Sequence, residues 1–256
     1  MRDKNGAIGR YWKKGLMKAV CKGASLAVLL MILPGLVRAQ SNEDCLACHN
    51  QPDLSVRKRG QKVKLYVDKD LLNQSVHASL DCIACHQGFS PSRIPHAKNI
   101  QPVACQACHD AGTYDKSVHG QALGAAGCSE CHGTHSILSP KNPESRVNRG
   151  HLASTCGKCH QDENERYSRS THGLSLAGGS KGAPSCVDCH GAHTIVPISD
   201  PESALCKTKE PAVCLKCHLD NPQVRQQVGI SAGFIADYKE SIHGVALASG
   251  HLNAPS

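Results

Sequence analysis

The sequence predicts a fold of short α-helices and irregular loops with minimal β-structure, in which side chains alone do not form the core. Beyond residue 39 the chain has only two Phe, four Tyr and no Trp, too few large side chains for an ordinary core of this length. The motif Cys-x-x-Cys-His occurs seven times, and the segments between its copies repeat and are rich in Gly, Pro, Ser and Asn.

Residues 1–39 have the composition of a secretory signal peptide. Basic residues precede the apolar run SLAVLLMILPGLV, and Val37 and Ala39 stand where signal peptidase prefers small residues. The run is too short for a comfortable membrane span. We therefore expect a periplasmic or extracellular protein, cleaved after Ala39. Membrane association through an uncleaved signal, or through a part of the protein beyond residue 256, is the alternative.

The net charge of +8 belongs almost entirely to this signal. Eight of the 29 basic and one of the 21 acidic residues lie in residues 1–39, so the remaining chain is close to neutral. Nucleic acid is therefore not an expected partner. The cluster Arg57, Lys58, Arg59, Lys62 and Lys64 is the local exception, and it is either a solvated face or a docking patch.

The seven motifs predict covalent haem. Paired cysteines also suit zinc or disulfides, but neither of these needs a histidine directly after the second cysteine. In c-type attachment the two thiols bind the porphyrin vinyl groups and the adjacent imidazole becomes an axial ligand of the iron. We expect seven haems c, at motifs 1 to 7 in chain order. The thioether residues are Cys45 and Cys48, Cys82 and Cys85, Cys105 and Cys108, Cys128 and Cys131, Cys156 and Cys159, Cys186 and Cys189, and Cys214 and Cys217. The proximal histidines are His49, His86, His109, His132, His160, His190 and His218.

Seven other histidines recur in repeated contexts, one for each iron, and are candidate distal ligands. His77, His119, His172 and His243 belong to an SxH repeat, and His96, His135 and His193 follow motifs 2, 4 and 6. Neutral imidazole is a good iron ligand, so the simplest interpretation is two histidines per iron. A surface or propionate-bonded role is the alternative for each, and it is favoured for the unrepeated His151 and His251. In CSECHGTH (128–135), His135 lies too near its own motif to reach the opposite haem face, so it is expected to serve a neighbouring haem.

The repeats divide the mature chain into two-haem modules. Motifs 4 and 5, and motifs 6 and 7, are each 28 residues apart, and both pairs enclose a Pro-Glu-Ser. The expected modules are 40–98 with haems 1 and 2, 99–144 with haems 3 and 4, 145–202 with haems 5 and 6, and 203–256 with haem 7. Segment 243–256 matches segment 172–185 at eight of fourteen positions. Because Cys186 follows the earlier copy, we expect an eighth motif beyond residue 256.

Local patterns predict how the ligands are presented. Segments 163–173 and 233–244 indicate short helices ended by the glycine after the ligand, and 54–68 indicates a β-hairpin around Gly60 and Gln61. The repeated Tyr114, Tyr167 and Tyr238 are expected to pack on porphyrin faces. Cys206 is left without a partner in the mature chain, as a buried thiol, an intermolecular link or the partner of a cysteine beyond residue 256.

The CxxCH array, the SVHG and CHGxH repeats and the string TCGKCH (155–160) resemble the periplasmic or extracellular multihaem c-type cytochromes of the cytochrome c3-like group. The resemblance implies a multihaem cytochrome c fold with a haem-packed core, and closely stacked bis-histidine haems of fairly low potential in an anaerobic respiratory chain. It also implies redox-protein partners, either a quinol-oxidising membrane cytochrome or a terminal reductase. The insertion between His86 and His96 departs from the repeat and leaves the second haem's ligand least defined.

Electron transfer is the favoured function, without catalysis. The alternatives are a multihaem oxidoreductase of the nitrite or hydroxylamine type and the haem domain of a larger quinol-oxidising complex. A reductase needs one iron with an open position, whereas the repeated histidines suffice to close all seven, and no motif ends in the lysine that often marks a nitrite-reducing haem.

Overall fold

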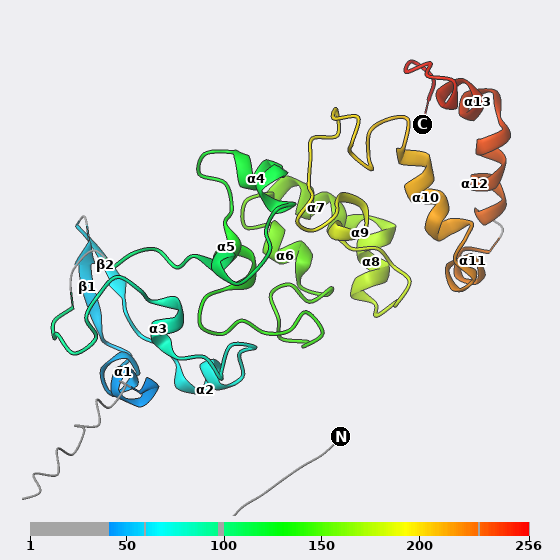
Figure 1. Cartoon of the computed structure of the whole chain (residues 1–256). Helices are drawn as coiled ribbons and strands as arrows, with labels where there is room; N and C mark the ends of the chain where they lie inside the picture. The colour runs from blue at the N-terminus through cyan, green and yellow to red at the C-terminus, as the bar shows by residue number, and fades with distance from the viewer. Residues whose placement is uncertain (1–40, 59, 97–99, 230, 256) are drawn as a thin grey trace, which may run out of the picture. The chain divides into compact units, whose positions relative to one another are not determined.

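The computed structural model describes residues 41–58, 60–96, 100–229 and 231–255. The expected signal peptide therefore lies outside the described residues, as does Arg59 of the basic cluster. The described chain consists of short helices and loops with a single two-stranded sheet (Figure 1), which agrees with the expected secondary structure.

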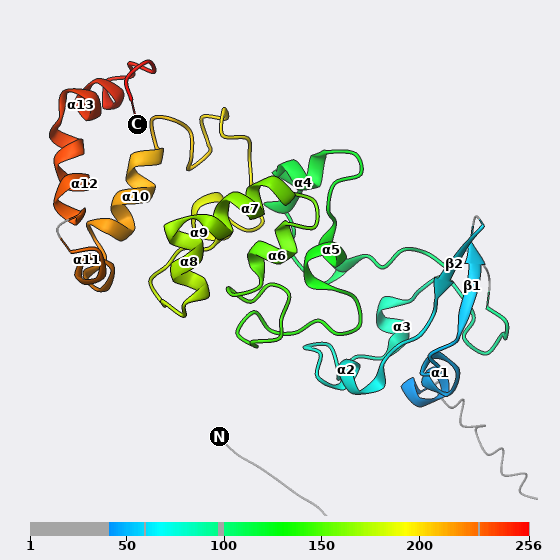
Figure 2. The ribbon, with the colours of Figure 1, turned by 180° about the vertical axis from the view of Figure 1, so that it is seen from behind.

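The helices are short, and most span only one or two turns. The α-helices are α1 (Asn42–His49), α2 (Lys69–Asn73), α3 (Cys82–Cys85), α4 (Val118–Gln121), α5 (Cys128–His132), α6 (Leu152–Cys156), α7 (Gln161–Arg169), α8 (Thr171–Ala177), α9 (Cys186–His190), α10 (Glu210–His218), α11 (Pro222–Val228), α12 (Ser231–Glu240) and α13 (Ile242–Ala248). Two 3-10 turns, η1 (Cys105–Ala107) and η2 (Tyr114–Lys116), complete the helical elements. Neighbours in sequence pack together, as α6 does with α7 and α10 with α11 and α12 (Figure 2).

The hairpin forms as expected, with its turn one residue earlier than the pattern indicated. Strands β1 (Ser55–Lys58) and β2 (Gln61–Lys64) are antiparallel, and Lys58 pairs with Gln61. The turn therefore includes Gly60, which has φ +81° and takes the left-handed conformation that glycine tolerates. Both strands are almost wholly exposed.

The expected helix ends at Gly173 and Gly244 are wrong. Helix α7 stops at Arg169 and α12 stops at Glu240, and in each case a serine then caps a new helix. Ser170 and Ser241 are extended, and their hydroxyls accept hydrogen bonds from the amides of Gly173 and Gly244. The candidate ligands His172 and His243 therefore lie in the first turn of a second helix, and the glycine after each lies inside that helix.

The described residues bury very little apolar surface. The buried hydrophobic residues are Leu46, Leu152, Ala183, Cys206, Val224 and Leu247. Large side chains such as Phe234 and Ile242 are more than four-fifths exposed. A chain of this length cannot be held together by so few buried side chains, so its stability must have another source.

Candidate haem-binding site

Each Cys-x-x-Cys-His motif lies in a short helix or turn, or begins at the last residue of a helix. In motifs 2, 3 and 5 the histidine amide donates a hydrogen bond to the carbonyl of the first cysteine, at 2.9, 3.0 and 3.0 Å. Residues separated by three or four positions lie on one face of such a turn. The two thiols and the imidazole therefore share a face, as a ring that bonds to both sulfurs and is ligated by the histidine requires.

Six of the motif histidines each face one histidine from outside the motifs. The ring centres are 6.5 Å apart for His49 and His96, 5.8 Å for His77 and His109, 5.8 Å for His86 and His135, 6.1 Å for His119 and His160, 5.9 Å for His132 and His193, and 6.0 Å for His172 and His218. Every pair joins one proximal candidate to one distal candidate.

These separations fit an iron between the rings. An imidazole nitrogen binds a first-row metal at about 2 Å and lies about 1 Å from its ring centre, so two rings on opposite sides of one metal are about 6 Å apart. Direct contact between aromatic rings covers a similar range. Contact alone, however, gives no reason for every pair to contain one motif histidine and one repeated histidine.

In the first pair, the hydrogen bonds use Nδ1 of each imidazole and leave Nε2 available to a metal. His49 Nδ1 lies 2.9 Å from the Leu65 carbonyl, and His96 Nδ1 lies 3.0 Å from the Arg93 carbonyl. A carbonyl partner of this kind holds the proton on Nδ1 and orients Nε2 toward a metal. Phe89 packs edge-on against His96, with ring centres 4.9 Å apart.

Burial favours the neutral imidazole at four of these positions. It lowers the pKa of His86, His132, His135 and His172, and a nearby histidine lowers each pKa further. Only the neutral ring has a lone pair to offer a metal. These sites are therefore ready for ligation at neutral pH.

The ring pairs show which motif histidine each repeated histidine faces. His135 faces His86 of motif 2, and His193 faces His132 of motif 4, so neither faces its own motif. His96, beyond the insertion in module 1, faces His49 of motif 1. The insertion gives His96 the length to reach back to the first motif, and motif 2 receives His135 instead.

Backbone hydrogen bonds join the SxH segments to the segments that follow the CHGxH histidines. The Val76 amide donates to the Ile137 carbonyl, and the Val118 amide donates to the Ile195 carbonyl, both at 2.8 Å. Each valine precedes an SxH histidine, and each isoleucine lies two residues after a CHGxH histidine. One hydrogen bond thus fixes two candidate ligands that serve different motifs.

The first cysteines of three motif pairs lie close together. Burial, and next the neighbouring Cys45 thiol, raise the pKa of Cys82 to about 11. Burial and Cys105 raise the pKa of Cys128 in the same way. A hydrogen bond between Cys156 and Cys186 raises the pKa of the first and lowers that of the second to about 7. The motifs brought together are 1 with 2, 3 with 4, and 5 with 6, the pairs that share a predicted module.

The repeated tyrosines tie three of the four SxH segments to the chain that follows them. Tyr114 donates to the Ala126 carbonyl at 2.6 Å, and Tyr167 donates to the Pro184 carbonyl at 2.7 Å. Both acceptors stand two residues before the first cysteine of the next motif. Tyr238 makes the same bond to Pro255 at 2.7 Å. The expected packing on porphyrin faces is untested, and the hydroxyl bond is a role that the sequence did not reveal.

The glycine that follows three of the four SxH histidines permits a close backbone approach, whereas Ala78 follows His77. A Cβ atom at Gly120, Gly173 or Gly244 would collide with the carbonyl oxygen of the tyrosine six residues earlier. Glycine is therefore required here for space, and not as a helix terminator.

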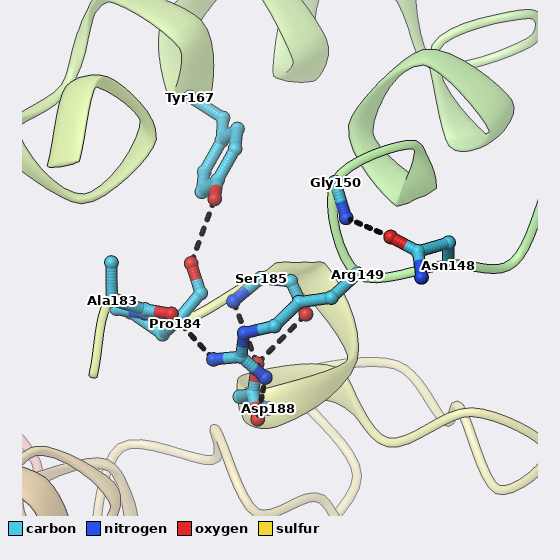
Figure 3. Close-up of polar contacts among 8 residues, drawn as sticks. All are labelled: Asn148, Arg149, Gly150, Tyr167, Ala183, Pro184, Ser185 and Asp188. Atoms are coloured by element: carbon cyan, nitrogen blue, oxygen red, sulfur yellow. Dashed lines mark hydrogen bonds and ion pairs between the residues drawn. The ribbon is translucent and has the colours of Figure 1, made fainter. Parts of the chain in front are cut away.

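Arg149 forms hydrogen bonds with residues at the start of the sixth motif. Sequence patterns did not identify it as a functional residue. Figure 3 shows its guanidinium between the Ala183 carbonyl and the Asp188 carboxylate, to which it donates at 3.2 Å. Asp188 also accepts from the Ser185 amide and hydroxyl, at 2.6 and 2.7 Å. Burial opposes ionisation of Asp188, but the Ser185 and Arg149 bonds outweigh it and hold its pKa below the ordinary value. A basic residue far from any motif carries no sequence signal for such a role.

Two of the fourteen predicted iron ligands have no ring partner in the described chain. His190 of motif 6 and His243 of the last SxH repeat are exposed, and neither has a ring neighbour among residues 41–58, 60–96, 100–229 and 231–255. The unrepeated histidines bond to backbone, His151 to the Ser145 carbonyl at 3.1 Å and His251 to the Ala246 carbonyl at 3.2 Å.

Cys206 and the basic cluster differ in their exposure. Cys206 is a buried free thiol, with its Sγ 3.7 Å from the Pro201 carbonyl oxygen. Arg57, Lys58, Lys62 and Lys64 are exposed on the hairpin.

Comparisons with protein-family models, curated proteins and solved structures found no match. In the part of the chain that the structure describes, no helix has the length and apolar character to cross a membrane. Within the same residues, no three or more His, Cys, Asp or Glu side chains converge on a metal-sized site. The geometry of the paired histidines therefore carries the functional argument.

Proposed function

We propose that this protein transfers electrons through seven covalently bound c-type haems in a respiratory pathway outside the cytoplasm. The observation that carries the proposal is the set of six histidine pairs, each joining a motif histidine to a repeated one at 5.8–6.5 Å. When bound, the haems would supply one-electron redox chemistry, and the protein would tune it through axial ligands, burial and hydrogen bonds.

The sparse side-chain core supports haem as the structural centre of the fold. Six hydrophobic residues are buried in the described chain, whereas large apolar side chains such as Ile94 and Leu174 are mostly exposed. A porphyrin is a large flat apolar surface, and its thioether bonds tie it to two points of the chain. Haem binding would then be coupled to folding, as metal binding is in small metal-dependent domains.

Contacts between successive motifs support transfer along the chain. After burial and Asp188, the thiols of Cys214 and Cys217 raise the pKa of Cys189, so motifs 6 and 7 lie close together. Cys159 similarly contributes to the raised pKa of Cys131, which brings motif 5 near motif 4. With the cysteine pairs described above, these contacts connect every motif to the next except motif 2 to motif 3, whose predicted modules are joined by the Val76–Ile137 bond.

The paired histidines favour an electron carrier over an enzyme. At an iron ligated by two imidazoles, no position is open to a substrate. Partners would then be other redox proteins, either a quinol-oxidising membrane cytochrome or a terminal reductase. Export to the periplasm or the cell exterior remains part of this proposal and rests on the signal-like residues 1–39.

One observation favours a second candidate. His190 has no opposing imidazole in the described chain, which is the arrangement that a substrate-binding haem of a multihaem reductase requires. A reductase with its reaction at motif 6 is therefore the competing function.

The test is a haem count combined with electron paramagnetic resonance of the ferric protein. The chain is expressed with haem-maturation machinery, and covalent haem is measured by mass and by pyridine haemochrome absorbance. We expect seven haems, at least six of them low-spin. A protein that folds without haem, or several high-spin irons in the intact chain, would contradict the proposal.

A further inference from the structure

Successive predicted modules exchange histidines in both directions. The SxH histidine of one module faces the odd-numbered motif of the next module. In return, the CHGxH histidine of that next module faces the even-numbered motif of the first. Between modules 1 and 2 the pairs are His77 with His109 and His135 with His86, and between modules 2 and 3 they are His119 with His160 and His193 with His132.

The third exchange is only half present. Module 3 sends His172 forward to His218 of motif 7, at 6.0 Å. Motif 6 should receive a histidine in return, but His190 has no imidazole opposite it in the described residues. By the rule of the first two exchanges, the absent ligand belongs to a CHGxH segment that docks on modules 3 and 4.

A backbone amide identifies the same absent segment independently. Val76 and Val118 each donate a hydrogen bond to an isoleucine two residues after a returning histidine. Thr171 stands at the equivalent position of the next SxH segment, and its amide has no such acceptor in the described chain. A segment that brought a histidine to motif 6 in the repeated geometry would also bring a carbonyl to Thr171.

Two further relationships in module 4 agree with this assignment. Cys214 is the first cysteine of its module, but unlike Cys45, Cys105 and Cys156 it has no first cysteine of another motif beside it in the described chain. Tyr238 nevertheless holds the Pro255 carbonyl in the way Tyr167 holds Pro184 before motif 6.

We propose that motif 6 is an acceptor site for a histidine from outside residues 41–255, on a segment of the pattern CHGxHxI. Resting on the haem function proposed above, the site places a neutral imidazole nitrogen on the open face of the iron at His190. The Thr171 amide donates a hydrogen bond to the carbonyl two residues after that histidine. Ligation forms one bond from nitrogen to iron, displaces a water molecule at most, and moves no electrons.

A second copy of this chain does not supply this ligand. Within each copy His135 and His193 already face motif histidines. The exposed His243 belongs to the SxH class, which faces only odd-numbered motifs in the three pairs seen. The ligand is therefore the imidazole of a separate CHGxHxI segment, whether on the same polypeptide or on another one.

The experiment uses the full 256-residue chain loaded with haem, after its haems have been counted. Ferric electron paramagnetic resonance and absorbance follow the spin state during titration with free imidazole, or with the peptide GTHSILSP, which copies residues 133–140. The control peptide GTQSILSP lacks only the imidazole. We expect one high-spin iron in seven, which the peptide converts to low spin at a concentration at least tenfold below that of imidazole.

The variant Thr171→Pro tests the amide separately. Ser170 is extended and Thr171 is the first residue of α8, a position that tolerates proline because its amide is not used within the helix. We expect the variant to lose the tenfold advantage of the peptide while its imidazole titration is unchanged. An equal loss for both ligands would instead indicate disturbed folding, which the thermal midpoint of the variant checks.

Each remaining outcome overturns the inference. Seven low-spin irons before any addition would place an internal ligand on motif 6, and His243→Gly would show whether it is His243. If the peptide converted the iron to low spin only at the concentrations that free imidazole needs, a docking segment with its own contacts would be ruled out. An open iron that binds nitrite or hydroxylamine but neither imidazole nor peptide would assign motif 6 to catalysis. A chain that folds without haem fails the proposed function itself, since no iron is then present to titrate.

Discussion

His135 lies opposite His86, with ring centres 5.8 Å apart, and not opposite His132, three residues before it in the same CHGTH string. The string is thus divided between two sites, because His132 faces His193. Each CHGxH segment of motifs 4 and 6 therefore connects the predicted module that contains it to the one before, and this division leads to the first prediction.

Removing His135 should open the iron of motif 2 and no other. The variant His135→Gly is expected to gain one high-spin ferric signal that free imidazole abolishes. In a background with Cys82→Ser and Cys85→Ser, which lacks the haem of motif 2, the same glycine should add no signal. The matched control is His151→Gly, since His151 bonds only to a backbone carbonyl in the described chain.

The pairing of His96 with motif 1 is tested in the same way. His96→Gly should open motif 1, so its new high-spin signal should vanish in a Cys45→Ser, Cys48→Ser background and persist without the haem of motif 2. The reverse dependence would place His96 at motif 2 and contradict the pairing with His49.

Gly173→Ala should damage the site through crowding. The new methyl group meets the Tyr167 carbonyl, and overpacking of this kind costs about 1–3 kcal/mol. Because His172 is adjacent, we expect a lower thermal midpoint together with partial loss of low-spin signal from motif 7. Gly233→Ala is the control, since a methyl group added there would meet no atom within 4 Å. Equal effects at the two glycines would rule out the crowding argument.

Tyr167→Phe separates the hydroxyl from the ring. If the bond to the Pro184 carbonyl is what matters, loss of the donor should cost about 0.5–1.5 kcal/mol in the free energy of unfolding. Denaturant unfolding followed by haem absorbance measures this. Unchanged stability would mean that the aromatic ring, packed as the sequence suggested, is sufficient.

Arg149→Lys should destabilise the start of motif 6. Lysine keeps the charge but cannot donate in the fixed fork that reaches both Ala183 and Asp188, and hydrogen bonds to charged groups contribute about 1.5–3 kcal/mol. Arg169→Lys is the control, because Arg169 pairs with Glu165 in solvent, where such pairs contribute about 0–1 kcal/mol. Thermal unfolding of both variants should show the larger change for Arg149.

Withholding haem should leave the chain unfolded. With so few buried apolar side chains in its described part, the apoprotein has little to offset its conformational entropy. We expect apoprotein, made without maturation machinery, to lack cooperative thermal unfolding by circular dichroism and to be digested rapidly by protease. A cooperative transition in the apoprotein would show that side chains alone specify the fold.

The sequence by itself predicted the chemical parts of the proposed site. Covalent haem attachment would need its ligands at adjacent positions, so Cys186, Cys189 and His190 are predicted from their spacing alone. Local patterns also sufficed for the hairpin, where glycine is needed in the turn at Gly60. They misplaced the helix ends at Gly173 and Gly244. The same residues fit a helix that ends at the glycine and a new helix that is capped by the preceding serine and needs glycine for space.

Only the tertiary structure decided which distal candidate faces which motif. His135 and His96 have the same side chain and each follows an even-numbered motif, and nothing local shows which iron each would reach. Their partners depend on non-local contacts such as the Val76–Ile137 hydrogen bond, which joins residues 61 positions apart. An iron held by two histidines would need one on each side of the porphyrin. The second histidine therefore depends on which segment, distant in sequence, folds back to that side.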